Sequence, residues 1–284
     1  MGGPGSTWPP RPVIGSFHNL FDLRCTSDNK DVSVMPSRFD DHVVILTGAG
    51  SGIGRAAALA FAKEGARVLG VGRRPEALRE TADLHPAIET LSADVSAAGA
   101  PEQIVRTAVD RWGRVDVLVN NAGVLAMMPL GQVTAEGINQ LLATNVTAPS
   151  LLAGAALPYL RSSQGVIVNV SSTFGHRPIA HASHYGASKA AIEQLTRSWA
   201  LELAPDNIRV NAVAPGPTES GALAGAGLSA GEIEHLKDAE AARIPLGRRG
   251  EPGEVAEWIL RLADAQTAWL TGQVLTVDGG LELA

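Results

Sequence analysis

The chain has 284 residues, of which 45% are hydrophobic and 18% are charged, and its formal net charge is −6. This length and composition allow one large domain or two small ones with a well-buried core. The acidic balance argues against a nucleic-acid-binding protein. No apolar run approaches the roughly 20 residues that a membrane-spanning helix needs, so we expect no membrane insertion.

The first part of the chain, residues 1–38, differs in composition from the rest. It is rich in Pro, Gly, Ser and Asn and has no sustained apolar period. We therefore predict a disordered or loosely attached extension, followed by a folded domain at residues 39–284. The extension lacks the segments of a signal peptide, and Cys25 is the only cysteine, which favours a cytoplasmic location. Met35, near the predicted boundary, is an alternative start.

Strand-like and helix-like segments alternate from residue 41 onward. Short apolar runs predict buried strands at residues 42–47, 67–72, 88–92, 115–120, 166–170, 208–214 and 274–277. Helical spacing predicts helices at residues 53–64, after Pro75, and at 101–112, 134–161 and 183–204. This alternation predicts a single Rossmann-type α/β fold, a doubly wound parallel sheet with helices on both faces. Ligands of such folds bind at the carboxyl ends of the strands.

A glycine-rich turn follows the first predicted strand and opens the first predicted helix. Glycines allow a tight turn and a close backbone approach to a pyrophosphate, and a helix N-terminus offers free N–H groups to phosphates. An ordinary glycine-rich turn is the alternative, but the strand before it and the helix after it favour a dinucleotide site. The predicted contacts are Thr47, Gly48, Gly50, Ser51, Gly52, Ile53 and Gly54, with the spacing G-x-x-x-G-x-G at Gly48, Gly52 and Gly54.

Three further motifs follow later strands. Asp94-Val95 follows the third predicted strand, Asn120-Asn121-Ala122-Gly123 the fourth, and Pro215-Gly216 the sixth. Together with the glycine turn, they resemble the short-chain dehydrogenase/reductase superfamily from about residue 39 to the end of the chain. The resemblance implies adenine contacts for the first motif, cofactor contacts for the second and a nicotinamide-side turn for the third. The residues so assigned are Asp94, Val95, Asn121, Ala122, Gly123, Pro215, Gly216 and Thr218, the last as a hydrogen-bond partner of the carboxamide.

The end of the second predicted strand indicates which nicotinamide cofactor the chain prefers. An acidic residue there would bind both ribose hydroxyls and repel a 2′-phosphate. This chain has Gly72 instead, followed by Arg73 and Arg74. Glycine leaves room and a guanidinium pairs well with phosphate, so we predict NADP(H). NAD(H) is the alternative, which holds if both arginines are only solvated residues at a helix start.

A tyrosine and a lysine in the sequence Tyr185-Gly186-Ala187-Ser188-Lys189 are the candidate proton-transfer pair. They lie at positions i and i+4, on one face of a predicted helix, in a chain with only two tyrosines. A free phenol has a pKa near 10, which a nearby ammonium and the positive ring of an oxidised nicotinamide would lower. The resemblance also implies that both residues contact the cofactor, Lys189 through the nicotinamide ribose.

Two further candidates complete the predicted catalytic set. Ser172 lies after the fifth strand and thirteen residues before Tyr185, the spacing of the superfamily's catalytic serine, although its neighbour Ser171 competes for the role. By resemblance, Asn145 bends the long helix and holds a water that relays protons to Lys189. The alternative for Asn145 is an ordinary polar residue of the helix.

Three histidines, His176, His181 and His184, cluster in the segment before Tyr185. No acidic or thiol ligand accompanies them in the sequence, so we predict pocket-lining roles and no metal site.

Three other functions compete with a carbonyl or alcohol oxidoreductase. A sugar-nucleotide epimerase would have a larger C-terminal domain and a different glycine spacing. An enoyl reductase would usually separate its tyrosine and lysine by six residues rather than the three found here. A non-catalytic nucleotide-binding sensor or scaffold would have lost Tyr185, Lys189 or Ser172, yet all three are intact.

The remaining expectations concern substrate and assembly. The substrate is a small molecule with a carbonyl or alcohol group, covered by a lid at about residues 219–247. The superfamily commonly pairs its two long helices, here residues 134–161 and 183–204, so we expect a homodimer or homotetramer.

Overall fold

A seven-stranded parallel sheet organises the part of the chain that the computed structural model describes, residues 37–219 and 229–284. Its order is β3-β2-β1-β4-β5-β6-β7, so the direction of winding reverses between β1 and β4, where ligands of such sheets bind. The predicted fold class is confirmed, and the predicted strands lie within two residues of the observed ones. The strands are β1 (Val43–Thr47), β2 (Arg67–Gly72), β3 (Ile88–Ser92), β4 (Val117–Asn120), β5 (Val166–Val170), β6 (Arg209–Pro215) and β7 (Val274–Val277).

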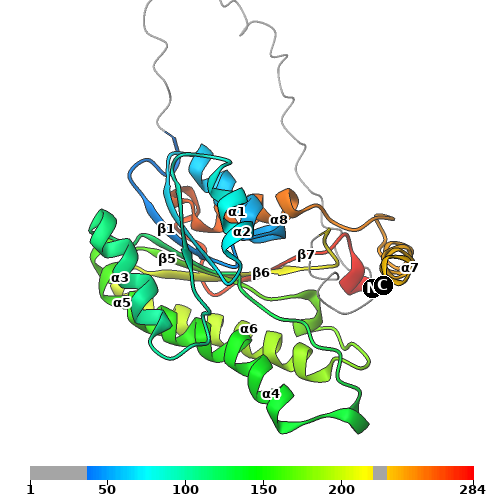
Figure 1. Cartoon of the computed structure of the whole chain (residues 1–284). Coiled ribbons are helices and arrows are strands. Elements are labelled where there is room, and N and C mark those ends of the chain that lie inside the picture. The colour runs from blue at the N-terminus through cyan, green and yellow to red at the C-terminus, as the bar shows by residue number, and fades with distance from the viewer. Residues whose placement is uncertain (1–36, 220–228) are drawn as a thin grey trace, which may run out of the picture. The chain divides into compact units, whose positions relative to one another are not determined.

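Helices cover both faces of this sheet (Figure 1). Successive strand residues point to opposite faces, so β1 contributes Val44 and Leu46 to one core and Val43 and Ile45 to the other. The first core is closed by α1 (Gly52–Lys63), α2 (Pro75–Ala82) and α8 (Pro252–Ala263), and the second by α3 (Ala100–Trp112), α5 (Ala148–Ser163) and α6 (Ser183–Leu203). Short 3-10 turns occupy Leu130–Gln132, Thr173–Gly175, Ala204–Asp206, Ala265–Thr267 and Leu281–Leu283.

The single helix predicted at residues 134–161 is wrong in one respect, because it is interrupted. It consists of α4 (Ala135–Leu142), a π-helical turn over Ala143–Thr147, and α5. Pro149 has no N–H group to donate to the carbonyl four residues earlier, which is that of Asn145. The interruption at Asn145 agrees with the bend that the resemblance implies.

The same segment, Ala135–Ser163, is long and apolar enough to cross a membrane when judged by length and composition, contrary to our expectation from the sequence. In the fold it packs against α3 and α6 and carries the buried amide of Asn145. A helix in the interior of a domain passes the same test.

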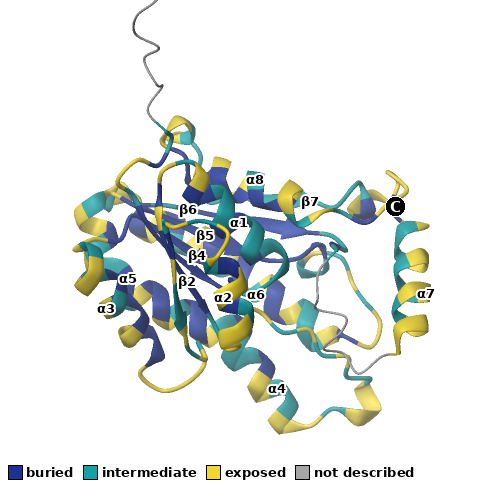
Figure 2. Cartoon of the chain, turned by 45° about the horizontal axis from the view of Figure 1, so that its top comes forward, coloured by how far each residue is buried: buried dark blue, intermediate teal, exposed yellow. Residues whose placement is uncertain are grey.

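The region after β6 contains α7 (Ala230–Ala241), a twelve-residue helix that begins with a capping box between Ser229 and Glu232. None of its residues is buried, as Figure 2 shows. The predicted lid therefore includes a helix, while its first part, residues 220–228, lies outside the described residues. So do residues 1–36, with Cys25 and Met35 of the predicted extension.

Candidate active site

A cavity of about 630 Å³ lies where the carboxyl ends of β1, β2, β3 and β4 meet. This is the edge at which the topology predicts a ligand. Most predicted cofactor contacts line it: Gly48, Gly50, Ser51, Gly52, Ile53, Gly54, Gly72, Arg73, Arg74, Asp94, Val95, Asn121, Ala122 and Gly123. Five further residues line the cavity that we did not predict: Leu78, Ala93, Val124, Leu125 and Thr144.

The glycine turn and the segment after β4 are joined by hydrogen bonds. The hydroxyl of Thr47 accepts from the backbone N–H groups of Asn121 and Ala122, both at 3.0 Å. The side-chain amide of Asn121 donates to the carbonyl of Thr47 at 2.8 Å. Thr47 is buried and does not line the cavity, so it supports the turn from the interior of the protein.

At the glycine turn the wall of the cavity is backbone rather than side chain, which suits the pyrophosphate of a dinucleotide. Gly48 adopts a positive φ of 72°, which favours glycine. A Cβ atom at Gly54 would overlap the carbonyl oxygen of Gly48 and lie 2.6 Å from the side-chain nitrogen of Asn121. The wall therefore leaves room for a pyrophosphate at the N-terminus of α1, where free N–H groups favour an anion.

Arg55 and Thr81, which the sequence analysis missed, hold the glycine turn against α2. The guanidinium of Arg55 donates to the carbonyl of Gly50 at 2.7 Å and to the hydroxyl of Thr81 at 3.0 Å. That hydroxyl donates in turn to the carbonyl of Ala49 at 2.9 Å. The only signal in the sequence is that a basic residue directly follows Gly54.

The far end of the cavity carries the two arginines after β2. Arg73 and Arg74 are exposed, and the guanidinium of Arg74 reaches the hydroxyl of Ser51 at 3.4 Å. Hydrogen bonds from Ser96 lower the pKa of Asp94, and the charge of Arg73 acts in the same direction. Since Asp94 is ionised, this end of the cavity holds two positive side chains and one negative one.

Lys189 links the cofactor cavity to the candidate proton-transfer residues. Its Nζ donates to the carbonyl of Val170 at 2.9 Å and lies 5.9 Å from the ring centroid of Tyr185. A Cβ atom at Gly123 would lie 3.3 Å from the same Nζ. Burial lowers the pKa of Lys189 to about 8, so the side chain still carries its charge at neutral pH.

Tyr185 lies on the first turn of α6, and its side chain is half-buried. Burial raises its pKa above the ordinary value, and a hydrogen bond with the hydroxyl of Ser172 acts in the opposite direction. We expected the pKa of Tyr185 to be lowered. The Nζ of Lys189 donates to the carbonyl of Val170 rather than to the phenol, so burial has the larger influence on the pKa of Tyr185.

The hydrogen-bond partners of Ser171 and Ser172 distinguish the two candidate serines. The hydroxyl of Ser171 bonds away from Tyr185, to the carbonyl of Lys189 at 3.2 Å and the carboxylate of Glu193 at 2.9 Å. The hydroxyl of Ser172 caps a short turn and lies next to the phenol of Tyr185. This arrangement favours Ser172 as the serine that faces a substrate.

Asn145 lies in the π-helical turn and its side chain is fully engaged. Its Oδ1 accepts from the N–H of Val124 at 2.9 Å, and its Nδ2 donates to the carbonyl of Val124 at 3.0 Å and to the hydroxyl of Ser188 at 3.0 Å. Asn145 therefore ties the segment after β4 to α6. No direct contact with Lys189 is among these hydrogen bonds.

Comparison with known proteins accounts for this combination of turn, cavity and side chains. Residues 48–282 match a family model described as enoyl-(acyl carrier protein) reductase. The chain is 37% identical over 249 residues to a 3-oxoacyl-(acyl-carrier-protein) reductase, FabG, of Thermotoga maritima, which covers 86% of this chain and 99% of that protein. The chain belongs to the short-chain dehydrogenase/reductase superfamily.

Other relatives agree. A sorbitol dehydrogenase of Cereibacter sphaeroides is 34% identical over 251 residues, covering 86% of this chain and 98% of that protein. A solved short-chain dehydrogenase/reductase of Caenorhabditis elegans, determined with its cofactor, has a TM-score of 0.82 and 34% identity, covering 87% of this chain and 97% of that one. The protein is therefore an NAD(P)-dependent oxidoreductase, and none of these relatives supports a non-catalytic sensor or scaffold.

The nicotinamide-side turn that the superfamily resemblance assigned follows β6. A Cβ atom at Gly216 would lie 2.8 Å from the Cα of Asp278, so the backbone of this turn passes close to the segment after β7. The hydroxyl of Thr218 donates to the carbonyl of Gly216 at 3.0 Å, and Thr218 is buried. The hydroxyl of Thr218 is thus used within the turn.

The three histidines do not form a cluster of metal ligands. His176 bonds through Nδ1 to the buried carboxylate of Glu193 at 2.9 Å. His181 and His184 lie in the segment that leads into α6. Among residues 37–219 and 229–284, no group of three His, Cys, Asp or Glu side chains is placed to hold a metal ion.

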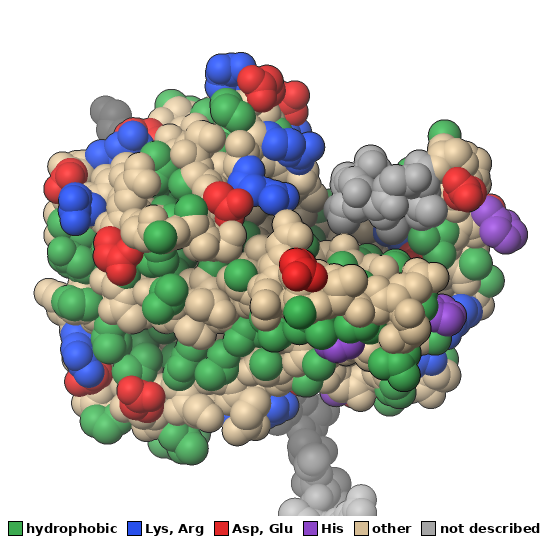
Figure 3. Space-filling model, turned by 60° about the horizontal axis from the view of Figure 1, so that its bottom comes forward, with side chains coloured by type: hydrophobic (Ala, Val, Ile, Leu, Met, Phe, Trp, Pro, Cys, Tyr) green, Lys and Arg blue, Asp and Glu red, His purple; other side chains and the backbone are tan. Residues whose placement is uncertain are grey.

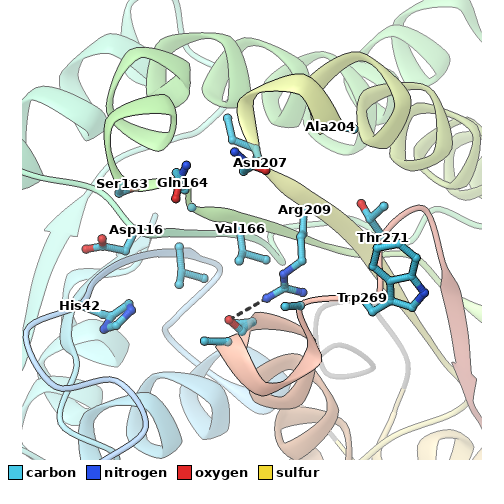
Figure 4. Close-up of a pocket in the computed structure, with 16 residues that line it drawn as sticks. His42, Asp116, Ser163, Gln164, Val166, Ala204, Asn207, Arg209, Trp269 and Thr271 are labelled. Atoms are coloured by element: carbon cyan, nitrogen blue, oxygen red, sulfur yellow. Dashed lines mark hydrogen bonds between the residues drawn. The ribbon is translucent and has the colours of Figure 1, made fainter.

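A second cavity, of about 730 Å³, lies at the opposite end of the sheet (Figure 4). Its lining includes His42, Asp116 and Arg209, which lie at the amino ends of strands. The guanidinium of Arg209 donates to the carbonyls of Leu262 and Ala263 at 2.7 and 3.2 Å, at the C-terminus of α8. This arginine stabilises the end of a helix, and the cavity is remote from the proton-transfer residues.

Proposed function

We propose that this protein moves a hydride between NADP(H) and a carbonyl or alcohol carbon of a small molecule, with Tyr185 as the general acid and base. The observation that carries the proposal is that the buried Lys189 lies against Gly123 of the cofactor cavity and near the ring of Tyr185, whose phenol lies next to Ser172. When bound, the nicotinamide supplies or accepts the hydride.

The residues of the chain supply the proton and orient the substrate. In the reducing direction, the phenol of Tyr185 gives its proton to the carbonyl oxygen, and in the oxidising direction the phenolate removes the proton of the alcohol. The hydroxyl of Ser172 holds the substrate oxygen toward Tyr185. The ammonium of Lys189, 5.9 Å from the ring centroid of Tyr185, is the nearby positive charge that would favour the phenolate during the reaction.

A preference for NADP(H) over NAD(H) is supported by Gly72 and the two exposed arginines after it. A 2′-phosphate beside Gly72 would meet no acidic side chain at the end of β2. Arg73 and Arg74 supply two guanidinium groups on the same side of the cavity as the hydroxyl of Ser51.

The choice of a carbonyl or alcohol over an enoyl substrate rests on spacing. Three residues separate Tyr185 and Lys189, which places them one helical turn apart on α6. The six residues expected of an enoyl reductase would place them about two helical turns apart instead, too far for the lysine to lie beside the phenol. The relatives named as 3-oxoacyl reductase and sorbitol dehydrogenase act on carbonyl or alcohol carbons, which supports this choice.

A screen of the purified protein against ketones, aldehydes and secondary alcohols tests the proposal, following the absorbance of the reduced cofactor. We expect turnover with at least one class of substrate and with NADPH above NADH. Tight cofactor binding without turnover on any member of a broad panel would favour a sensor or scaffold instead.

We also propose a cytoplasmic homodimer or homotetramer that pairs through α5 and α6. Leu151 on α5 and Leu201 on α6 are 55% and 81% exposed. Figure 3 shows hydrophobic side chains gathered on the side of the molecule that carries these helices. Light scattering at micromolar concentration should give a multiple of the 29.4 kDa chain mass, and Leu151→Glu with Leu201→Glu should give the monomer. A monomeric wild type would refute the pairing.

A further inference from the structure

Arg249 is a buried guanidinium that contacts three separate groups around the nicotinamide-side turn. Its Nη2 donates to the carbonyl of Thr218 at 2.6 Å, and its Nε lies 2.9 Å from the carboxylate of Glu219. Its Nη1 pairs with the carboxylate of Glu240, which lies on α7. The side chain is only 6% exposed, so it lies between the turn and the helix rather than in solvent.

The backbone around Arg249 runs beside the same turn. Gly250 donates its N–H to the carbonyl of Pro217 at 3.0 Å and accepts from the N–H of Glu219 at 2.8 Å. Thr218 and Gly250 thereby form a parallel bridge. These bonds hold the backbone of Gly250, the residue after Arg249, beside the turn that follows β6.

Helix α7 depends on these charges for its placement. Its capping box lets the helix form locally, but none of its twelve residues is fully buried, and its apolar side chains Ile233 and Leu236 are only half-buried. A second ion pair joins it to the turn, because Lys237 lies 2.6 Å from Glu219. That hydrogen bond is the main reason why the pKa of Glu219 is lowered.

The four side chains form a balanced cluster of two positive and two negative charges. Balance matters because an unpaired guanidinium at this depth would carry a large desolvation penalty. A planar guanidinium can bond a carbonyl and two carboxylates at once, which an ammonium on a flexible stem cannot do with fixed geometry. Arg249 is therefore suited to set the distance between the turn and α7.

The neighbouring arginine has a different role and supplies a matched comparison. Arg248 pairs with Glu254 at 2.6 Å, in the first turn of α8, and its side chain is 55% exposed. It makes no contact of this kind with α7 in the part of the chain that the structure describes. The two residues have equal charge and adjacent positions, so their variants separate placement of α7 from a general loss of positive charge.

We propose that Arg249 is a positioning residue that couples the nicotinamide-side turn to α7, and so sets where this helix borders the bound substrate. The coupling of turn and substrate rests on the function proposed above. The attachment of α7 through Arg249 does not, and it can be measured without any substrate. Because α7 buries none of its own residues, it can move while the core stays intact.

The experiment compares Arg249→Met, Arg249→Lys and Arg248→Met by amide hydrogen exchange of the full chain and by steady-state kinetics. In Arg249→Met we expect exchange in α7 to rise about tenfold, with α1 and α6 unchanged. We expect KM for the best substrate to rise about tenfold with a smaller change in kcat, as expected when a group that positions substrate is loosened. Arg249→Lys should restore only part of both effects, and Arg248→Met should leave α7 exchange and KM unchanged.

Unchanged exchange in α7 of a folded Arg249→Met protein would overturn the proposal. If Arg249→Met does not fold, Glu240→Ala removes the contact with α7 and leaves Glu219 to pair with the guanidinium, and the same comparison applies. If α7 exchange rises but KM does not, α7 is attached through Arg249 without bordering substrate, which overturns the coupling. Absence of turnover in the wild type would instead count against the proposed function, while the exchange data would still test the attachment.

Discussion

Helices α6 and α7 are attached to the rest of the fold in opposite ways. Helix α6 buries polar and charged side chains along its inner face, among them Ser188, Lys189, Glu193 and Thr196. Helix α7 buries none of its residues and is joined to the fold by the ion pairs of Glu240 and Lys237 (Figure 2). Tyr185 and Lys189, the proposed proton-transfer pair, thus lie on a helix fixed by the core.

This difference in attachment suits what we propose for each helix, proton transfer for α6 and a border of the substrate site for α7. Proton transfer needs heavy atoms within hydrogen-bond reach, which a buried helix with satisfied polar groups maintains. Entry and release of a substrate need a border that can move while the core stays intact, which a helix without buried residues allows. Changes in the rigid region should therefore affect binding and chemistry strongly, while changes around α7 should affect them modestly.

The largest effect should come from crowding the glycine turn. In Gly54→Ala the new Cβ overlaps the carbonyl of Gly48, so we expect cofactor affinity to fall by about a hundredfold, the upper part of the range for overpacking a tight site. The matched control is Gly154→Ala in α5, where a Cβ would meet nothing within 4 Å. Fluorescence titration with NADPH measures both. Equal affinity in the two variants would contradict a backbone-lined pyrophosphate site.

The next effect concerns cofactor choice. Removing the guanidinium in Arg73→Ala should weaken NADPH binding by about tenfold to a hundredfold, the equivalent of roughly 1.5–3 kcal/mol for a charge-assisted pair, and leave NADH almost unchanged. Arg79→Ala, an exposed residue of α2 that pairs with Glu76, is the control for net charge. Equal losses for the two cofactors, or a wild-type preference for NADH, would remove the basis for the NADP(H) assignment.

A smaller effect is expected at Lys189, where removing the charge should raise the stability of the protein instead of impairing it. Because the pKa of Lys189 is lowered to about 8 in the folded protein, the folded state is disfavoured once the side chain is charged. Wild-type stability should therefore decrease as pH falls from about 10.5 toward 8 and change little below that through this group. In Lys189→Met this dependence should vanish.

At neutral pH the same variant should be more stable than the wild type by about 2 kcal/mol, which is the pKa difference converted to free energy less one lost hydrogen bond. Urea unfolding at two pH values measures the change, and turnover should be lost in parallel. A strongly destabilised Lys189→Met protein would show that the ammonium contributes more to the fold than to the chemistry.

Much of the fold followed from short apolar runs, because a strand buried on both faces has a continuous hydrophobic sequence, as Val43–Thr47 does. The interruption at residues 143–147 did not follow from periodicity. It depends on a missing hydrogen bond at Pro149 and on contacts of Asn145 with Val124, twenty-one residues away.

The candidate site likewise has residues that could be predicted from the sequence and residues that could not. The turn at Gly48 to Gly54 and the pair Tyr185 and Lys189 could be predicted because each is local in sequence. Arg55 could not be assigned, since its partners on α2 are known only once that helix is placed. Arg249 was missed for the same reason, because Glu219 lies thirty residues before it and one of its contacts is a backbone carbonyl.

The most direct test of the central claim is turnover by Tyr185→Phe beside Tyr159→Phe, the only other tyrosine, which packs partly buried on α5. The first variant keeps the ring and removes the transferable proton. We predict that its turnover falls by about 10²–10⁴-fold, the loss typical of a general acid, with NADPH affinity within about twofold of the wild type. Tyr159→Phe should keep near-normal turnover. Near-normal turnover by Tyr185→Phe on the best substrate would contradict the account.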